Sequence, residues 1–229
     1  MISGRSNAEP DMTTLQDKTM VIIGAGSGIG RRIAEDATAQ GAQVVLVGRP
    51  EVDLAEEATV RALAEHVGEL DYLVSLAADH ANGPITDLDH DAVRRAFDAK
   101  VIGPILLAKH FAPRFRPGGA MLLFSGVAAW RPAPGRAVMA TTNAAAATLA
   151  EALAVELAPV RVNAISPGIV DSGVWDGPGR EEFFRSVADR NPARRVGTPA
   201  DISAAALLAL TNPFLTGATL HVDGGGRLA

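Results

Sequence analysis

The stretch TMVIIGAGSGIG, residues 19–30, decides the fold class of this chain. A run of β-branched and apolar residues ends abruptly in a turn that holds Gly24, Gly28 and Gly30, and residues 31–40 then have a helical pattern. A short run that is apolar throughout is typical of a strand buried on both faces of a parallel sheet. The stretch therefore predicts a strand, a tight glycine turn and a helix.

Apolar runs and helical stretches alternate along the rest of the chain. The runs lie at 44–47, 70–76, 120–124, 160–165 and 218–222, and the helical stretches at about 56–68, 89–112, 136–157, 180–190 and 199–211. This alternation predicts an α/β fold with a doubly wound parallel sheet, the Rossmann fold. The length of 229 residues suits one domain, which we expect over 18–229 after a flexible leader at 1–17.

Composition argues against several classes of function. The formal net charge is −5, and an acidic chain without clustered Lys and Arg binds nucleic-acid phosphates poorly. No apolar run reaches the roughly 18 residues of a membrane helix, and the polar start of the chain does not resemble a signal peptide. The chain has no cysteine, and its His, Asp and Glu residues lack metal-ligand spacing. We therefore expect a cytoplasmic protein that binds no nucleic acid, membrane or catalytic metal.

The glycine turn has the context that dinucleotide binding demands. Glycine has an open dihedral range, which lets the backbone approach a pyrophosphate closely. The amino terminus of the following helix then faces the anion with free N–H groups. Because glycine turns are common, a purely structural turn is the alternative.

The end of the second predicted strand indicates which dinucleotide is preferred. An acidic residue there would bind ribose hydroxyls and repel a 2′-phosphate, but this chain has Gly48-Arg49. Arg49 can pair with a 2′-phosphate, so NADP(H) is favoured over NAD(H). The alternative is that Arg49 is a solvated surface arginine.

Several motifs resemble those of the short-chain dehydrogenase/reductase family. They are G-x-x-x-G-x-G at 24–30, DYLVSLAA at 71–78, RVNAISPG at 161–168, and TG at 216–217 followed by VDGG at 222–225. The resemblance extends over nearly the whole chain from residue 18. It implies an NAD(P)(H)-dependent oxidoreductase that acts on a small molecule. It also implies a homodimer or homotetramer formed through the helices at 89–112 and 136–157.

The resemblance further implies which residues contact the cofactor. With the turn glycines Gly24 and Gly30 they are Ser27, Gly28 and Ile29 along the pyrophosphate, Ala77 and Ala78 near the ribose, Asp53 and Leu54 near the adenine, and Pro167, Gly168 and Val170 beside the nicotinamide. Three residues separate Arg49 from Asp53, too few for the family's usual helix and third strand. We therefore expect the helix after the second strand to be missing and the third strand to be vestigial.

The catalytic positions of the family are all changed. Met139 aligns with the tyrosine, Asn143 with the lysine, Gly126 with the serine and Lys100 with the asparagine. In the family the tyrosine gives a proton to the alkoxide that hydride addition creates, and general acid catalysis contributes roughly 10²–10⁴ in rate. A methionine thioether supplies no proton. Substrates that need less acid help than ketones, such as iminium ions or conjugated alkenes, are therefore expected.

Lys100 and Asn143 resemble an exchange of two family residues. We expect Lys100 to keep an ammonium beside the nicotinamide ribose, where it polarises an oxygen or relays a proton, and Asn143 to hold the ribose hydroxyls or a water. Ser125, one residue from the serine position, is a further candidate if its loop shifts. The alternative is drift in a site no longer used for redox chemistry, as in a dinucleotide-binding sensor or assembly protein, or in a non-redox enzyme.

The substrate is expected to be apolar. By the resemblance, Trp130, Met139, Trp175, Phe183 and Phe184 surround the pocket, and residues 171–197 form a mobile substrate loop. The alternative for the loop aromatics is that they only pack the loop.

Two groups of polar residues near the pocket are further candidates. Asp79 and His80 follow the third run as an acid pair, and Arg131 and Arg136 can meet an anionic substrate. Solvated loop arginines are the commoner case.

Overall fold

The computed structural model describes residues 15–24, 26, 28–173 and 177–229. In this part of the chain six parallel strands form one sheet, in the order β2-β1-β3-β4-β5-β6. The strands are β1 (Thr19–Ile23), β2 (Gln43–Val47), β3 (Leu70–Ser75), β4 (Phe115–Phe124), β5 (Arg161–Pro167) and β6 (Thr219–Val222). The helices are α1 (Gly28–Ala39), α2 (Glu57–Val67), α3 (His90–Phe97), α4 (Gly103–Phe111), α5 (Ala137–Glu156), α6 (Arg180–Arg190) and α7 (Pro199–Thr211).

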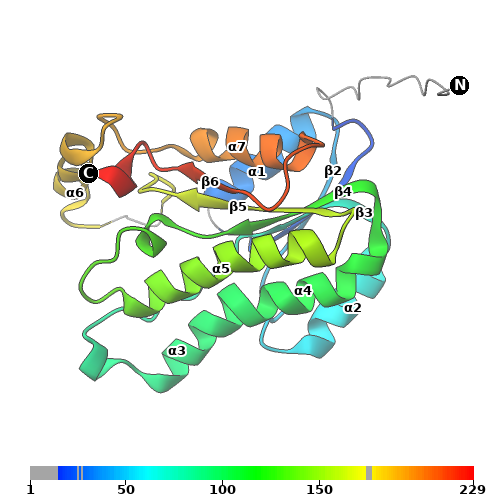
Figure 1. Ribbon diagram of the computed structural model, residues 1–229, viewed down its shortest axis with the longest axis horizontal. Coiled ribbons are helices and arrows are strands. Elements are labelled where there is room, and N and C mark those ends of the chain that lie inside the picture. Colours follow the sequence, from blue (N-terminus) through cyan, green and yellow to red (C-terminus); the bar gives the residue numbers. More distant parts are fainter. Residues whose placement is uncertain (1–14, 25, 27, 174–176) are drawn as a thin grey trace, which may run out of the picture.

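Helices cover both faces of the sheet. In Figure 1, α1 and α7 lie above the sheet and α2, α4 and α5 lie below it. Side chains alternate between the two layers along each strand, so Met20 and Ile22 pack against α1 and α7, whereas Val21 and Ile23 face the other layer. The predicted doubly wound α/β sheet is confirmed.

The chain between β2 and α2 contains neither a helix nor a strand, as residues 48–56 form only turns and extended backbone. β3 therefore pairs directly with β1, and β2 is left at the edge of the sheet. Leu46 of β2 is 52% exposed because no neighbouring helix or strand covers it. The family's helix was expected to be missing between β2 and Asp53. This prediction is confirmed, because the first helix after β2 is α2, which begins at Glu57.

The single helix expected over 89–112 is interrupted. A π-helical turn, η2 (Asp98–Ile102), joins α3 to α4 and carries Lys100. Pro104 explains the interruption, because it has no N–H to donate to the carbonyl four residues earlier, and a regular α-helix would press its ring on that carbonyl. π-turns of this kind are frequent at functional sites.

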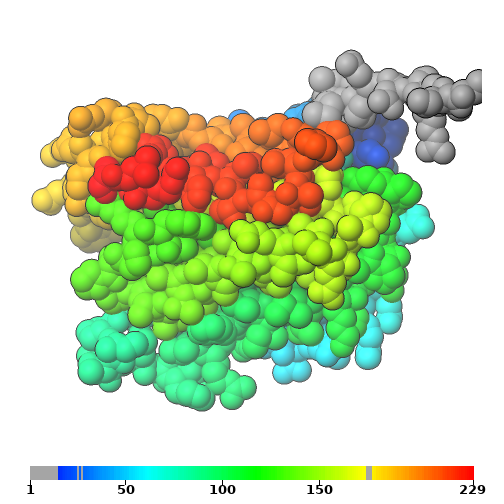
Figure 2. All heavy atoms as spheres, in the orientation of Figure 1, coloured from blue at the N-terminus to red at the C-terminus, as the bar shows by residue number. Residues whose placement is uncertain are grey.

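Helix α5 is long and apolar enough, by length and composition, to cross a membrane, which our expectation of no such stretch did not foresee. It packs along β4 and β5, and the side that faces the sheet is buried. Figure 2 shows its outer side as a band across the surface, between α3 and α4 on one side and β6 on the other. This packing is that of a core helix, and such helices pass the same test of length and composition.

The packed domain begins before residue 18, where we expected it to begin. Residues 1–14 lie outside the described residues, but the side chain of Leu15 is fully buried, and the N–H of Asp17 donates to the Gly41 carbonyl at 3.1 Å. Leu15, which falls within the expected leader, is thus part of the core.

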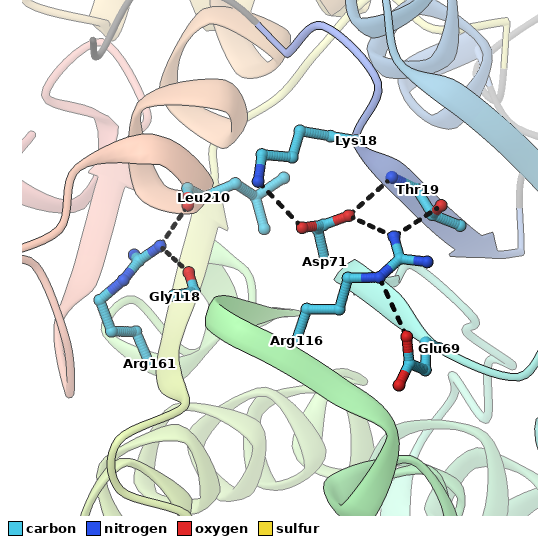
Figure 3. A network of polar contacts seen from close by, with 8 residues as sticks. All are labelled: Lys18, Thr19, Glu69, Asp71, Arg116, Gly118, Arg161 and Leu210. Carbon is cyan, nitrogen blue, oxygen red and sulfur yellow. Dashed lines mark hydrogen bonds and ion pairs between the residues drawn. The ribbon is translucent and has the colours of Figure 1, made fainter. Parts of the chain in front are cut away.

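A buried carboxylate ties the amino-terminal ends of three strands together (Figure 3). Asp71 of β3 accepts hydrogen bonds from the Lys18 ammonium at 3.1 Å, from the Thr19 N–H at 2.9 Å and from the Arg116 guanidinium at 3.0 Å. Burial raises the pKa of Asp71, but these hydrogen bonds together hold that pKa below its usual value. The cluster fixes the starts of β1, β3 and β4 relative to one another.

Replacing this carboxylate is expected to destabilise the fold. Asp71→Asn should lower the free energy of unfolding at pH 7 by about 2 kcal/mol, because two cations lose their buried partner. A lowered pKa stabilises the folded state above the ordinary carboxyl pKa, and this contribution is lost as the pH falls through the folded value. The difference between wild type and Asp71→Asn in urea unfolding should therefore narrow below about pH 4.

Glu69→Gln is the matched control, because its exposed carboxylate meets the same Arg116 at 3.4 Å. It should change the free energy of unfolding by less than about 0.5 kcal/mol. Equal effects of the two variants would contradict the role given to Asp71.

Candidate functional site

A cleft of about 500 Å³ opens where the carboxyl ends of β1, β2 and β3 meet. Parallel α/β sheets bind ligands at this edge. The structure brings together six of the residues predicted from the sequence, Gly24, Arg49, Asp53, Leu54, Ala77 and Ala78. Sequence reasoning missed three residues that also line the cleft, Arg95, Asp98 and Ala99. All three belong to the helical stretch that leads to Lys100.

Gly24 is required by its surroundings. Its φ is +83°, and a Cβ at this position would lie 2.7 Å from the amide nitrogen of Ala77. Only glycine adopts this conformation easily and lets the ends of β1 and β3 come this close. The glycine thus opens the floor of the cleft to backbone contact with a ligand, as a bound dinucleotide requires.

Arg49 is exposed at the end of β2, and no partner for its guanidinium is found among the described residues. The other charges of the cleft are already engaged in part. Arg95 lies 3.9 Å from Asp79, and the Asp53 carboxylate accepts the N–H of Ala55 at 3.0 Å. Arg49 is therefore the cation of the cleft that is available to an anionic ligand group.

Other predicted cofactor residues lie outside this cleft. Ile29 and Val170 pack against the core between α1 and the sheet, and Gly168 borders a second cavity. A Cβ at Gly28 would lie 2.6 Å from the Ser172 carbonyl oxygen, so the loop after β5 crosses the start of α1. The structure thus joins the loop after β5 to the glycine turn, a contact that sequence reasoning missed.

Three further predicted residues complete this account. Gly30 is buried in α1, Pro167 ends β5 outside the lining of either cavity, and Ser27 lies outside the described residues. Gly30 and Pro167 therefore do not line the cleft. The role expected for Ser27 stays a prediction.

The ammonium of Lys100 is bound by three oxygen atoms from two other elements. It donates to the carbonyls of Phe124 at 2.9 Å and Ser125 at 3.1 Å, and to Oδ1 of Asn143 at 2.6 Å. Burial lowers the pKa of Lys100 to about 8. The structure thus brings Lys100 and Asn143, predicted together from the sequence, into direct contact between the π-turn, the end of β4 and α5.

This ammonium fixes the orientation of the Asn143 amide. An ammonium only donates, so Oδ1 must face Lys100 and the NH₂ group must face the other way. A Cβ at Gly126 would lie 2.7 Å from Nδ2 of Asn143. Position 126 therefore has no room for a side chain while Lys100 holds Asn143 in place.

The hydroxyl of Ser125 bonds to the backbone of Asn143 and not to its side chain. It is buried and donates to the backbone carbonyl of Asn143 at 2.7 Å. Met139 lies one helical turn before Asn143 on α5, and Tyr72 is buried in β3 near its amino-terminal end. The hydrogen bond of Ser125 therefore ties the chain just after β4 to α5.

His80 lines the cofactor cleft, close to Asp79. Burial lowers the pKa of His80, and the positive charges of Lys100 and Arg136 lower it further, whereas Asp79 raises it. His80 is therefore held neutral at pH 7, with Lys100 and Arg136 near enough to influence it. The described residues contain no group of three His, Asp or Glu side chains that could hold a metal ion.

A second cavity of about 330 Å³ lies beside the ends of β4 and β5. Its wall includes Val127, Arg131, Ile169, Phe183, Val187 and Arg190. Asn191 also lines it, and its Oδ1 is buried without a hydrogen-bond partner among the described residues.

The aromatic residues expected around the pocket are divided. Phe183 lines this cavity, whereas Phe184 packs against Phe183 and under the Arg180 guanidinium. Trp130 packs edge-to-face on His221, with ring centroids 4.4 Å apart. Trp175 lies outside the described residues.

Comparison with known proteins gives consistent matches over most of the chain. A family model described as enoyl-(acyl carrier protein) reductase matches residues 51–226. The short-chain dehydrogenase/reductase ucsE of Acremonium sp is 31% identical, over 94% of this chain and 97% of its own length.

Solved structures agree. A small-chain dehydrogenase in complex with NADPH superimposes with a TM-score of 0.89 at 32% identity, over 93% of this chain and 100% of that chain. A 3-ketoacyl-(acyl-carrier-protein) reductase from Brucella melitensis complexed with NADH gives a TM-score of 0.83 at 28% identity, over 93% and 100%.

The tight space at position 126 gives a prediction. Gly126→Ser should lower the free energy of unfolding by about 1–3 kcal/mol, because the new side chain must displace the pinned Asn143 amide. In Gly126→Ser/Asn143→Ala the two costs should not add, and the coupling energy from urea unfolding should be about 1 kcal/mol. Gly48→Ser, with no atom within 4 Å of its Cβ, is the control and should be near neutral. Additive effects would show that the two positions do not compete for space.

Proposed function

The chain belongs to the short-chain dehydrogenase/reductase family of NAD(P)-dependent oxidoreductases, and from this premise we propose that it reduces a small apolar substrate with NADPH, using Lys100 and Asn143 in place of the family's usual proton-transfer groups. One observation carries the proposal. The ends of β1, β2 and β3 enclose one cleft that presents glycine backbone at Gly24 and a guanidinium at Arg49. This pairing of groups suits a phosphorylated dinucleotide.

NADPH is favoured by the charge at the end of β2. Arg49 holds the 2′-phosphate, Ala77 and Ala78 border the ribose, and Asp53 and Leu54 border the adenine. When bound, NADPH supplies the hydride. The similar proteins solved with NADPH and with NADH support the cofactor class, and Arg49 supports the choice within that class.

Lys100 supplies positive charge to the reaction. Its ammonium stabilises negative charge that develops on a substrate oxygen or enolate, in a buried site where such an interaction is strong. Its pKa of about 8 lies close to physiological pH, which suits a proton donor. Asn143, held by Lys100, presents its N–H donor to the ribose hydroxyls or to a water. Conjugated alkenes fit this site, because their reduction demands less acid help than that of ketones and passes through an enolate that the ammonium stabilises. The iminium ions also expected from the sequence fit it less well, because they carry a positive charge beside that of Lys100.

A second function is favoured by one specific observation. The three hydrogen bonds of the Lys100 ammonium and the one donated by the Ser125 hydroxyl all go to acceptors of the protein itself. A dinucleotide-binding protein without redox turnover needs no free donor here. Tight NADPH binding without loss of NADPH absorbance, on a broad panel of carbonyl, enone and imine compounds, would support this second function and contradict the first.

Arg49 should set cofactor preference. Arg49→Ala is expected to weaken NADPH binding about tenfold, through loss of a charge-assisted hydrogen bond to the 2′-phosphate, and to leave NADH binding within twofold. Cofactor fluorescence titration measures both. Arg61→Ala, an exposed arginine of α2, is the control and should change neither. Equal losses for NADPH and NADH would argue against a 2′-phosphate contact.

Lys100 should set the rate of reduction. On a compound that the wild type reduces, Lys100→Met should lower kcat/KM for NADPH oxidation by about 10²-fold or more. In the wild type, kcat/KM should fall as the pH rises through about 8, because the ammonium loses its proton. Lys100→Arg keeps the charge and should lose this inflection.

Lys109→Met, which removes an exposed ammonium of α4, is the control and should stay within twofold of the wild type. A rate for Lys100→Met equal to that of the wild type would remove Lys100 from the mechanism.

A further inference from the structure

We infer that the cavity beside β4 and β5 is a carboxylate-binding substrate pocket, in which Arg131 and Arg190 select apolar substrates that carry a carboxylate. The inference rests on the proposed function and names the substrate class of that site. It goes beyond the expectation of an apolar ligand, because the wall of the cavity is divided into an apolar part and a cationic part.

One face of α6 forms part of this wall. Phe183, Val187 and Arg190 follow one another at spacings of four and three residues, so they lie on the same side of the helix and all line the cavity. The face thus runs from an aromatic ring to a guanidinium within two turns. Figure 1 shows α6 beside the end of the chain, at the edge of the sheet where the strands terminate.

The second guanidinium is held in place by the backbone. Arg131 donates from Nη1 to the carbonyl oxygen of Gly226 at 2.9 Å, which fixes its position at the cavity wall. A solvated loop arginine needs no such anchor. The other nitrogen atoms of the guanidinium remain donors for a planar anion, and a carboxylate matches this geometry.

The charges around the cavity do not cancel. Asp223 is the acidic residue among those that line it, and it is already paired with Arg227, whose guanidinium lies 3.2 Å away and whose N–H donates to the same carboxylate at 3.2 Å. Arg131 and Arg190 therefore give the lining a net positive charge, and no acidic partner for either is found among the described residues.

The cavity also lies where the reaction would take place. Val127 lines the cavity and directly follows Gly126, the position that contacts the Asn143 amide, and Gly168 and Ile169 line it just after the end of β5. Its volume of about 330 Å³ is at the lower end of the roughly 300–1,000 Å³ of small-molecule pockets. A compact conjugated acid fits this space, with its apolar part against Phe183 and Val187 and its carboxylate at the arginines.

The test compares an acid with its neutral ester on the NADP⁺ complex, where no reduction occurs. trans-Cinnamate and methyl trans-cinnamate share the apolar part and differ in charge, and calorimetric titration measures both dissociation constants. The wild type should bind cinnamate at least about tenfold more tightly than the ester. Arg131→Gln and Arg190→Gln should each weaken cinnamate binding about five- to tenfold and leave ester binding within twofold.

Arg185→Gln is the matched control, because Arg185 is an exposed arginine of the same helix that does not line this cavity. It should leave both constants unchanged, and thermal unfolding should show all three variants folded. Equal binding of acid and ester by the wild type, failure of both to bind at millimolar concentration, or an acid preference that survives both arginine variants would overturn the inference.

Measuring cofactor binding distinguishes a failure of this inference from a failure of the proposed function. If NADP⁺ and NADPH do not bind, the proposed function fails, and the acid and ester are then compared on the free protein, where the same tenfold ratio is expected. If the cofactor binds but the acid has no advantage, the carboxylate pocket alone is wrong.

Discussion

The buried ammonium of Lys100 is the interaction on which the site depends. It joins the π-turn between α3 and α4, the end of β4 and the first half of α5 through three hydrogen bonds. A buried cation costs several kcal/mol of desolvation unless it is well paired, and here neutral carbonyl and amide oxygens pair it. The incomplete compensation appears as a pKa lowered to about 8. A residue with no use for its charge would be replaced at little cost by an apolar one, which favours a functional role for this cation.

The residues at positions 100, 126 and 143 depend on one another. Lys100 turns the NH₂ group of Asn143 toward Gly126, and that group occupies the space where a side chain at position 126 would begin. Asn143 therefore leaves room only for glycine at position 126. Lys100 in turn determines how the Asn143 amide is oriented. Independent drift gives no reason for three positions to fit one another in this way. Their mutual fit favours a site that changed as a unit, although Met139 takes no part in the hydrogen bonds.

How far the sequence predicts the structure depends on the range of the interactions. The strand and helix order follows from local patterns, the missing element after β2 follows from the family resemblance, and the structure agrees with both. The π-turn at 98–102 was not predicted, since a helical pattern does not show where the hydrogen-bond register slips. The positions of Arg190 and Asn191 depend on where the loop after β5 places α6, which no local pattern encodes. The contact between Gly28 and Ser172 joins loops 144 residues apart in sequence and could be found only in three dimensions.

The missing helix and strand concentrate cofactor recognition in one short loop. In this chain nine residues, 48–56, lead from the end of β2 to α2 and place Arg49 and Asp53 on the same cleft. Thr59, in the first turn of α2, accepts the N–H of Asp53 at 3.0 Å and donates to its carbonyl at 2.8 Å, which fixes the loop to the helix. Arg49, proposed to hold the 2′-phosphate, and Asp53, proposed to border the adenine, therefore lie on one segment that Thr59 ties to α2. The short connection also leaves β2 at the edge of the sheet. The apolar side chain of Leu46 is therefore exposed to solvent, which is a cost of this arrangement.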